Sequence, residues 1–161
     1  MYPMKRVYIE TTIVSYLAAF PSGNIVAAAH QHITHEWWKL RSEYELCTSA
    51  LVHKEAGQGD SSAAARRLDI LRGMHVLEVN EETDTVALAI MASGLLLAKA
   101  VYDAQHMAIA TVHGVHYVVT WNFRHIANPA IMYALGRIVA QKGYELPVLC
   151  TPEILLGEKL K

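Results

Sequence analysis

The sequence predicts an α/β domain in which about five parallel strands form a central sheet covered by helices on both faces, giving three layers. Short runs rich in β-branched and aromatic residues alternate along the chain with longer stretches that have the apolar spacing of helices. Turn and capping residues, such as Asn24, Gly73 and Gly114, stand where one kind of run gives way to the other. Parallel strands need a long crossover connection, which is usually a helix, so this alternation is typical of a parallel sheet.

The predicted strands are short and mostly apolar. The run HYVVTW, residues 116–121, is the most β-prone in the chain and is expected to form a central strand. The other strands are expected at residues 6–10, 45–48, 76–79 and 147–150.

Capping residues define most of the predicted helices. Asn24 can cap a helix over residues 25–41, and Ser49 can cap a short helix that carries Glu55. Either Asp60 or Ser61 can cap the helix before Gly73. The remaining helical segments are expected at residues 81–92, 98–113 and 129–143, with a terminal turn opening at Pro152.

The segment directly after the first strand is expected to be a loop. It contains the hydroxyl residues Thr11, Thr12 and Ser15, which commonly cap or line such loops.

Length and composition suggest one globular domain, residues 1–161, with apolar surface to spare. The chain is 53% hydrophobic and only 18% charged, so we expect a homodimer or a protein partner to cover part of that surface. The net charge is −1 and the pI is near 6.7, which excludes a global basic field for nucleic acid; any RNA contact must be local.

No feature of the sequence suggests export or membrane insertion. The first residues lack the pattern of a secretory signal, and the longest apolar stretch, residues 86–98, is shorter than the ~20 residues that span a bilayer. Cys47 and Cys150 lie in apolar strand-like runs without metal or redox spacing. We therefore expect a cytoplasmic protein with no membrane contact.

Four polar residues stand where a parallel sheet would place a ligand site. Ligands bind outside the carboxyl ends of the strands, at the point where the strand order reverses. Glu10 closes the first strand and Asn122 follows the HYVVTW strand, while Glu55 and Asp103 lie on neighbouring helices. Carboxylates that converge without cysteine or histidine companions suit a hard cation, Mg²⁺ or Mn²⁺.

Four segments together resemble the signature blocks of the PIN-domain family, in the family's order and spacing. These are VYIETTIVSYL, SALVHKEA, DAQHMAIA and VVTWNFRHIANP. Because they are spread along the sequence, the resemblance covers nearly the whole chain. The resemblance is to the VapC-like toxin ribonucleases of bacterial type II toxin-antitoxin pairs.

The resemblance implies a PIN-like fold and hydrolysis of RNA phosphodiester bonds by water activated on Mg²⁺ or Mn²⁺. Glu10, Glu55 and Asp103 match the family's acidic positions and Asn122 matches the fourth, so these are the implied catalytic residues. Glu10, Asp103 and Asn122 are the implied metal ligands. A small antitoxin protein is an implied partner.

Residues around these positions are candidates for positioning the substrate. The resemblance implies that a hydroxyl near the first acid, from Thr11 or Thr12, orients metal waters or the phosphate. Arg124 and His125 are candidates for phosphate contact, although a hydrogen bond that orders the loop is the simpler role for His125.

Two departures from the family pattern motivate an alternative. Glu10 stands where aspartate is usual, and Asn122 lacks a charge at a position that is acidic in many members. The alternative is a catalytically weakened PIN-like module that binds RNA or protein. A receiver- or phosphatase-like protein is disfavoured, because such folds carry a reactive aspartate where this chain has Glu10.

Overall fold

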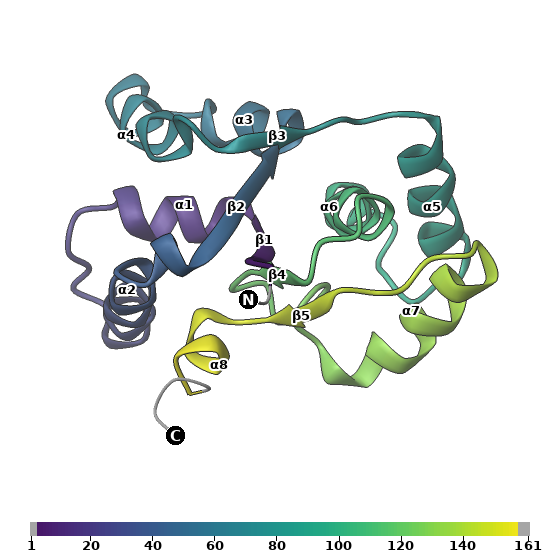
Figure 1. Cartoon of the computed structure of the whole chain (residues 1–161). Coiled ribbons are helices and arrows are strands. Elements are labelled where there is room, and N and C mark those ends of the chain that lie inside the picture. Colours follow the sequence, from purple (N-terminus) through teal and green to yellow (C-terminus); the bar gives the residue numbers. More distant parts are fainter. Residues whose placement is uncertain (1–2, 158–161) are drawn as a thin grey trace.

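The computed structural model describes residues 3–157, and its centre is a five-stranded sheet in which every neighbouring pair is parallel (Figure 1). The strand order is β3-β2-β1-β4-β5. The strands are β1 (Lys5–Ile9), β2 (Tyr44–Ser49), β3 (His75–Leu77), β4 (Tyr117–Val119) and β5 (Val148–Cys150). The predicted strands are confirmed, with ends that differ by one to a few residues.

The middle strand, β1, is buried on both faces. Val7, Tyr8 and Ile9 are all 0% exposed, as expected for the apolar run of a parallel strand covered by helices on both sides. The HYVVTW segment forms β4, which lies inside the sheet between β1 and β5. Its interior position confirms the prediction, although only its central residues pair as a strand.

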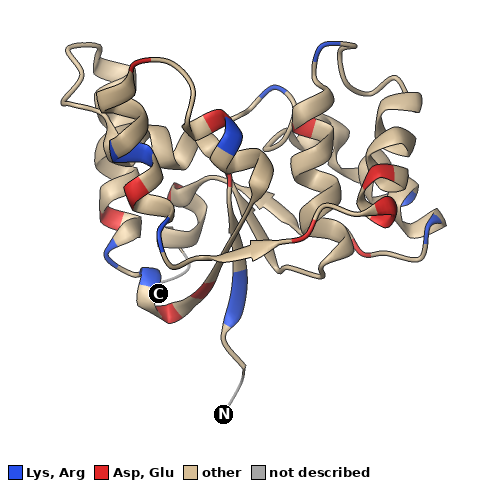
Figure 2. Cartoon of the chain, turned by 90° about the horizontal axis from the view of Figure 1, so that it is seen from above, with Lys and Arg blue, Asp and Glu red and all other residues tan. Residues whose placement is uncertain are grey.

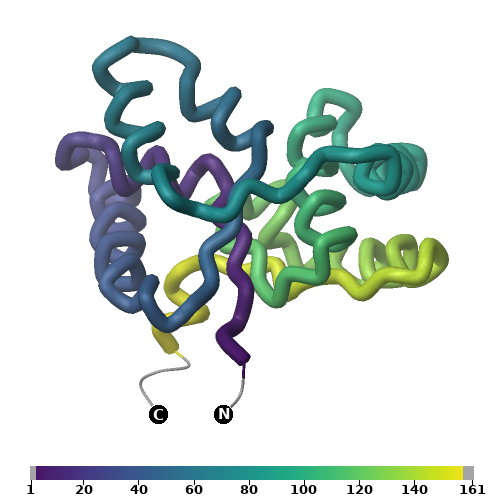
Figure 3. Tube along the Cα trace, turned by 45° about the horizontal axis from the view of Figure 1, so that its top comes forward, coloured from purple at the N-terminus to yellow at the C-terminus, as the bar shows by residue number. Residues whose placement is uncertain are grey.

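Helices cover the two faces of the sheet and give the expected three layers. In Figures 1 and 3, α1, α2 and α4 lie on one side of the sheet and α5, α6 and α7 lie on the other. The helices are α1 (Thr11–Ala18), α2 (Ile25–Trp38), α3 (Ala50–Ala56), α4 (Ser61–Leu71), α5 (Glu81–Ala92), α6 (Val101–Val112), α7 (Pro129–Gln141) and α8 (Pro152–Gly157), with a 3₁₀ turn at Arg41–Glu43.

The predicted helix caps have clear counterparts. The side chains of Asn24, Ser49 and Asp60 each accept a backbone N–H in the first turn of the following helix. Of the two candidates for the α4 cap, the structure selects Asp60. Gly73 and Gly114 follow helices with positive φ angles of 82° and 63°, a conformation that glycine adopts without steric strain.

The expected loop after the first strand is wrong, because α1 begins at Thr11. Glu10 is its N-cap, and the Glu10 carboxylate accepts the backbone N–H of Thr12. Ile13 and Val14 are 0% exposed, so packing of the helix against the sheet outweighs the modest helix propensity of four β-branched residues in a row.

The strand order reverses between β1 and β4. From β1 the chain moves outward to β2 and β3, and it then returns to the other side of β1 to form β4 and β5. The crevice at the carboxyl ends of β1 and β4 is therefore the place where this architecture binds ligands. Within residues 3–157, no helix is both long and apolar enough to cross a bilayer.

Candidate active site

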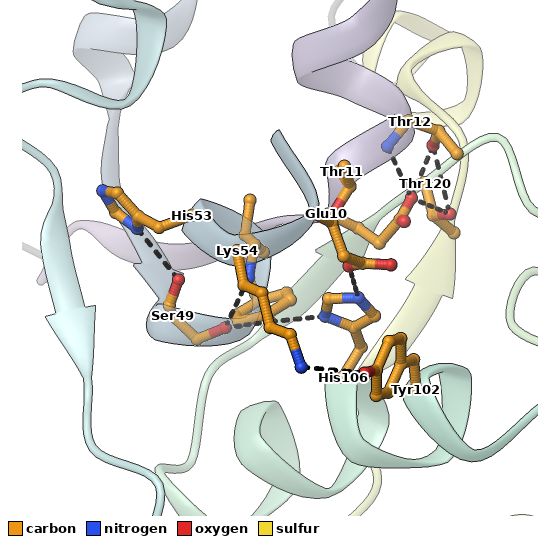
Figure 4. Close-up of polar contacts among 12 residues, drawn as sticks. Glu10, Thr11, Thr12, Ser49, His53, Lys54, Tyr102, His106 and Thr120 are labelled. Carbon is orange, nitrogen blue, oxygen red and sulfur yellow. Dashed lines mark hydrogen bonds and ion pairs between the residues drawn. The ribbon is translucent and has the colours of Figure 1, made fainter. Parts of the chain in front are cut away.

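Glu10 is fixed between the ends of β1 and β4. It is only 4% exposed, and its Oε2 accepts hydrogen bonds from the Thr12 backbone N–H at 3.1 Å and from the Thr120 hydroxyl at 2.7 Å. The Thr12 hydroxyl donates to the same oxygen (Figure 4). These donors offset the desolvation of a buried carboxylate and hold it in one orientation.

Glu55 is held on α3 by a second set of donors. Its Oε1 accepts the Thr11 hydroxyl at 2.7 Å and His106 Nε2 at 2.6 Å. Burial raises the pKa of Glu55. The hydrogen bonds from His106 and Thr11, together with the electrostatic interactions with His106 and Lys54, lower it by more, so the net pKa lies below the usual value. Glu55 is therefore ionised at neutral pH.

Asp103 lies in the first turn of α6 and is partly buried. Burial raises its pKa, and the negative charge of Glu55 adds to that effect. His125, a hydrogen bond from the side chain of Asn122, and His106 act in the opposite direction without cancelling it. The Asp103 carboxyl is therefore within the range of electrostatic interaction with Glu55 and His125. A divalent cation next to such a carboxyl would favour its ionised form.

Asn122 shapes the loop that follows β4. Its Oδ1 accepts the backbone N–H groups of Arg124 at 3.2 Å and His125 at 3.0 Å. With that oxygen engaged, the amide N–H groups are left to interact with Asp103, and the Asn122 side chain lowers the pKa of that carboxyl. In this arrangement Asn122 orients an acidic neighbour and fixes a turn. Its own oxygen could bind a metal only if those backbone contacts loosened.

His106 is a site residue that the sequence reasoning missed. The expectation of carboxylates without histidine companions is wrong, because the fully buried His106 contacts Glu55 directly. Its Nδ1 lies 2.7 Å from the Tyr8 hydroxyl, which lies 2.8 Å from Ser49 Oγ. A signal was available: His106 is three residues after Asp103, and this spacing places both on one side of α6.

The buried hydrogen bonds that link Ser49, Tyr8, His106 and Glu55 all donate in the same direction, toward Glu55. Burial raises the pKa of Tyr8 far above its ordinary value, so the phenol keeps its proton. Tyr8 then donates to His106 Nδ1, and His106 Nε2–H donates to the ionised Glu55. The Ser49 hydroxyl accepts the Val52 N–H and donates to Tyr8. The hydroxyls of Ser49 and Tyr8 and both ring nitrogens of His106 are thus paired, and this series fixes Glu55 Oε1 from within the core.

The structure brings the predicted residues to one end of the sheet. Thr11 contacts Glu55, and Thr12 contacts both Glu10 and the backbone N–H of Trp121. Arg124 is exposed on the loop after Asn122, and His125 is 9% exposed. Thr120 was not predicted; it lies two residues before Asn122 and contacts Glu10.

The donor set suits a hard divalent cation without forming a complete cage. Among the residues the structure describes, no three Asp, Glu, His or Cys side chains form a ready group of metal ligands. The hydrogen bonds to Glu10 fall on Oε2 and those to Glu55 fall on Oε1. Each carboxylate thus keeps a second oxygen for another partner. Mg²⁺ commonly takes one or two carboxylates and completes its shell with water, so these residues fit that ion.

Comparison with known proteins identifies the architecture. No protein-family model matches the sequence, and no curated protein matches it either. The structure is similar to that of VapC20 from Mycobacterium tuberculosis, a toxin that cleaves the sarcin-ricin loop, with a TM-score of 0.54 and 17% identity over 70% of this chain and 86% of that one.

A second similar structure is VapBC2 from Rickettsia felis, solved with a DNA fragment from its promoter. The TM-score is 0.50 and the identity is 13% over 73% of this chain and 89% of that one. At these identities the comparison concerns the fold alone. The chain has a VapC-like PIN-domain fold.

Proposed function

We propose that the protein is a divalent-metal-dependent endoribonuclease and the toxin of a toxin-antitoxin pair. The observation that carries the proposal is the arrangement of Glu10, Glu55 and Asp103 around the crevice between β1 and β4. Each carboxylate comes from a different element, and specific hydrogen-bond donors orient Glu10 and Glu55. The VapC-like fold supports the same activity, because one similar protein is a toxin that cleaves the sarcin-ricin loop.

In the proposed site, Glu10 and Asp103 hold the metal and Glu55 completes the acidic pocket. When bound, Mg²⁺ or Mn²⁺ would lower the pKa of a bound water and neutralise charge on the phosphate. Thr12 and Thr120 hold Glu10, while Thr11 and His106 hold Glu55. Asn122 has been named as a metal ligand on the family pattern; its contacts support a role in orienting Asp103.

Substrate contact is proposed for the loop after Asn122. Arg124 is exposed there and is the residue proposed to contact a phosphate. His125 is less exposed, and its electrostatic interaction with Asp103 lowers the pKa of that carboxyl. Lys and Arg residues are spread over many elements of the chain (Figure 2). RNA affinity must therefore come from local contacts at the site.

The remaining parts of the proposal concern the setting of the protein. We propose that residues 1–161 act as one domain in the cytoplasm, as a homodimer with a small antitoxin protein as partner. Exposed apolar side chains such as Leu88 on α5 and Ile154 on α8 support an assembly larger than the monomer.

The test is RNA cleavage with Mg²⁺ or Mn²⁺, with and without EDTA, by the parent chain and two matched variants. Asp103→Asn is expected to abolish cleavage. Asp84→Asn should leave cleavage unchanged, because Asp84 is exposed on α5, away from the proposed site. It is a matched control, since both aspartates lie in the first turn of a helix. Equal residual cleavage by both variants would show that the activity is a contaminant.

A second candidate function is a catalytically weakened module that binds RNA or protein. The absence of a three-ligand group among the described residues, with the engagement of Asn122 Oδ1, favours it. Calorimetric titration with Mn²⁺ separates the two functions, since a chain that binds no metal at millimolar concentration is a binding module.

A further inference from the structure

Four aromatic rings gather beside Glu10, and they come from three separate segments. The rings of His30 and Trp121 are stacked, with centroids 4.0 Å apart and planes 15° from parallel. Tyr16 meets both rings edge-on, at 5.7 and 6.1 Å. Phe123 lies 5.9 Å from each of the stacked rings. These four residues are called the aromatic cluster below.

Hydrogen bonds tie the aromatic cluster to the catalytic carboxylates. The backbone N–H of Trp121 donates to the Thr12 hydroxyl at 2.8 Å, and that hydroxyl donates to Glu10. On the other side, Trp121 Nε1 donates to the buried Thr34 hydroxyl at 2.8 Å. Trp121 is therefore held through both its backbone and its indole, and this fixes the cluster relative to Glu10.

Phe123 presents its ring to solvent at the edge of the site. It is 52% exposed, whereas Trp121 behind it is 7% exposed. The turn that holds Phe123 outward is fixed by Asn122, whose side chain accepts the N–H groups of Arg124 and His125. Immobilising an exposed phenyl ring contributes little to folding. The same geometry provides a preorganised surface for a planar ligand, with the exposed Arg124 next to it.

A groove along α1 continues from the cluster. It begins at Thr12, which holds Glu10, and has a volume of about 350 Å³. Phe20, the residue after Ala19, is 73% exposed, and the guanidinium of Arg66 lies 4.3 Å from the Phe20 ring. The groove is lined by residues at helical spacing, namely Thr12, Ser15, Tyr16 and Ala19.

Two exposed rings therefore accompany this groove, and each has an arginine near it: Phe20 contacts Arg66, and Phe123 precedes Arg124 in the sequence. Unpaired nucleotides offer the matching alternation of flat bases and phosphate charges. A ring fixed by the catalytic loop itself is also adjacent to any phosphate held at Glu10 and Asp103. These two features favour single-stranded RNA over a peptide as the occupant.

We propose that the aromatic cluster is a stacking subsite for an unpaired base next to the scissile phosphate, with Phe123 as the ring that the base contacts. The groove along α1 receives the neighbouring nucleotide. This subsite deepens the proposed ribonuclease function and rests on it. It makes cleavage selective for unpaired segments, in which a base is free to leave its neighbours.

Fluorescence anisotropy with a labelled seven-nucleotide single-stranded RNA tests the subsite by binding and not by cleavage. All proteins carry Asp103→Asn, so that the RNA stays intact. Adding Phe123→Ala is expected to weaken affinity about tenfold, because stacking on one aromatic ring contributes on that scale. Phe123→Tyr should retain the affinity. Tyr133→Ala, which removes a 79% exposed ring on α7, should leave it unchanged.

The outcomes separate the subsite from the nuclease. If Phe123→Ala and Tyr133→Ala bind the RNA as tightly as their parent, or if the parent binds no RNA, the subsite is wrong. If the selective effect of Phe123→Ala appears while the chain without Asp103→Asn cleaves no RNA, the subsite stands and the proposed catalysis fails. A peptide that binds the chain and is lost with Phe123→Ala, when RNA binding is unaffected, would also overturn the RNA assignment.

Discussion

The phenolic oxygen of Tyr8 makes two hydrogen bonds in the core, at 2.7 Å to His106 Nδ1 and at 2.8 Å to Ser49 Oγ. Tyr8→Phe removes that oxygen and keeps the ring, so the packing of this fully buried side chain changes little. Ser49 still accepts the Val52 N–H, whereas His106 Nδ1 is left buried without its partner. Since an unpaired buried acceptor costs about 1–3 kcal/mol and the lost hydrogen bond adds roughly 1 kcal/mol, the free energy of unfolding should fall by about 2–4 kcal/mol.

Urea denaturation followed by circular dichroism at pH 7 measures this loss, and thermal unfolding should show a Tm lower by roughly 5–15 °C. Tyr133→Phe is the matched control, because Tyr133 is 79% exposed on α7. Its effect should stay within about 0.5 kcal/mol. If Tyr8→Phe is as stable as the parent and the control, Tyr8 does not belong to a buried hydrogen-bonded chain, and the proposed support of Glu55 through His106 fails.

Three further perturbations probe the same neighbourhood. Thr120→Val removes a hydroxyl that donates to Glu10. It should lower kcat for RNA cleavage about tenfold, because hydrogen bonds to charged groups contribute about 1.5–3 kcal/mol. Thr120→Ser should restore kcat, and equal kcat for the Val and Ser variants would contradict this role. Thr34→Val leaves the buried Trp121 Nε1–H unpaired and should lower the free energy of unfolding by about 1–3 kcal/mol in urea denaturation, whereas an unchanged urea midpoint would show that this hydrogen bond is not formed. The folded-state pKa of Glu55 is below its unfolded value, so its ionised form stabilises the fold at pH values above about 4.3. This stability is lost as the pH falls through the folded-state pKa. The difference in urea midpoint between the parent and Glu55→Gln should therefore shrink from pH 7 to pH 3, and a constant difference would refute the sign of the shift.

Local patterns were enough to predict the sheet and most helices, because the signals that define them lie within a few residues. Asn24 and Ser49 cap their helices as their positions suggested. Helix α1 was missed because its β-branched residues read locally as a loop after a strand. Its formation depends on burial of Ile13 and Val14 against the sheet and on capping by Glu10, and the burial is a tertiary effect.

The strand-end rule led to Glu10 and Asn122, which follow two neighbouring strands as expected. It could not give the contacts that orient them. The hydrogen bond between Tyr8 and His106 joins residues 98 positions apart, and the one between Thr120 and Glu10 joins residues 110 apart. No local pattern carries such pairings, since they arise only when the sheet assembles.

The most direct test of the central claim, that the carboxylates around the β1–β4 crevice hold a divalent ion, is calorimetric titration of Mn²⁺ into the parent chain, Glu10→Gln, Asp103→Asn and the control Asp84→Asn. The parent and Asp84→Asn should bind Mn²⁺ with the same affinity, and the Glu10 and Asp103 variants should each lose at least about tenfold, since each removes a charged ligand. Mn²⁺ affinity that is equal in all four proteins would contradict the account.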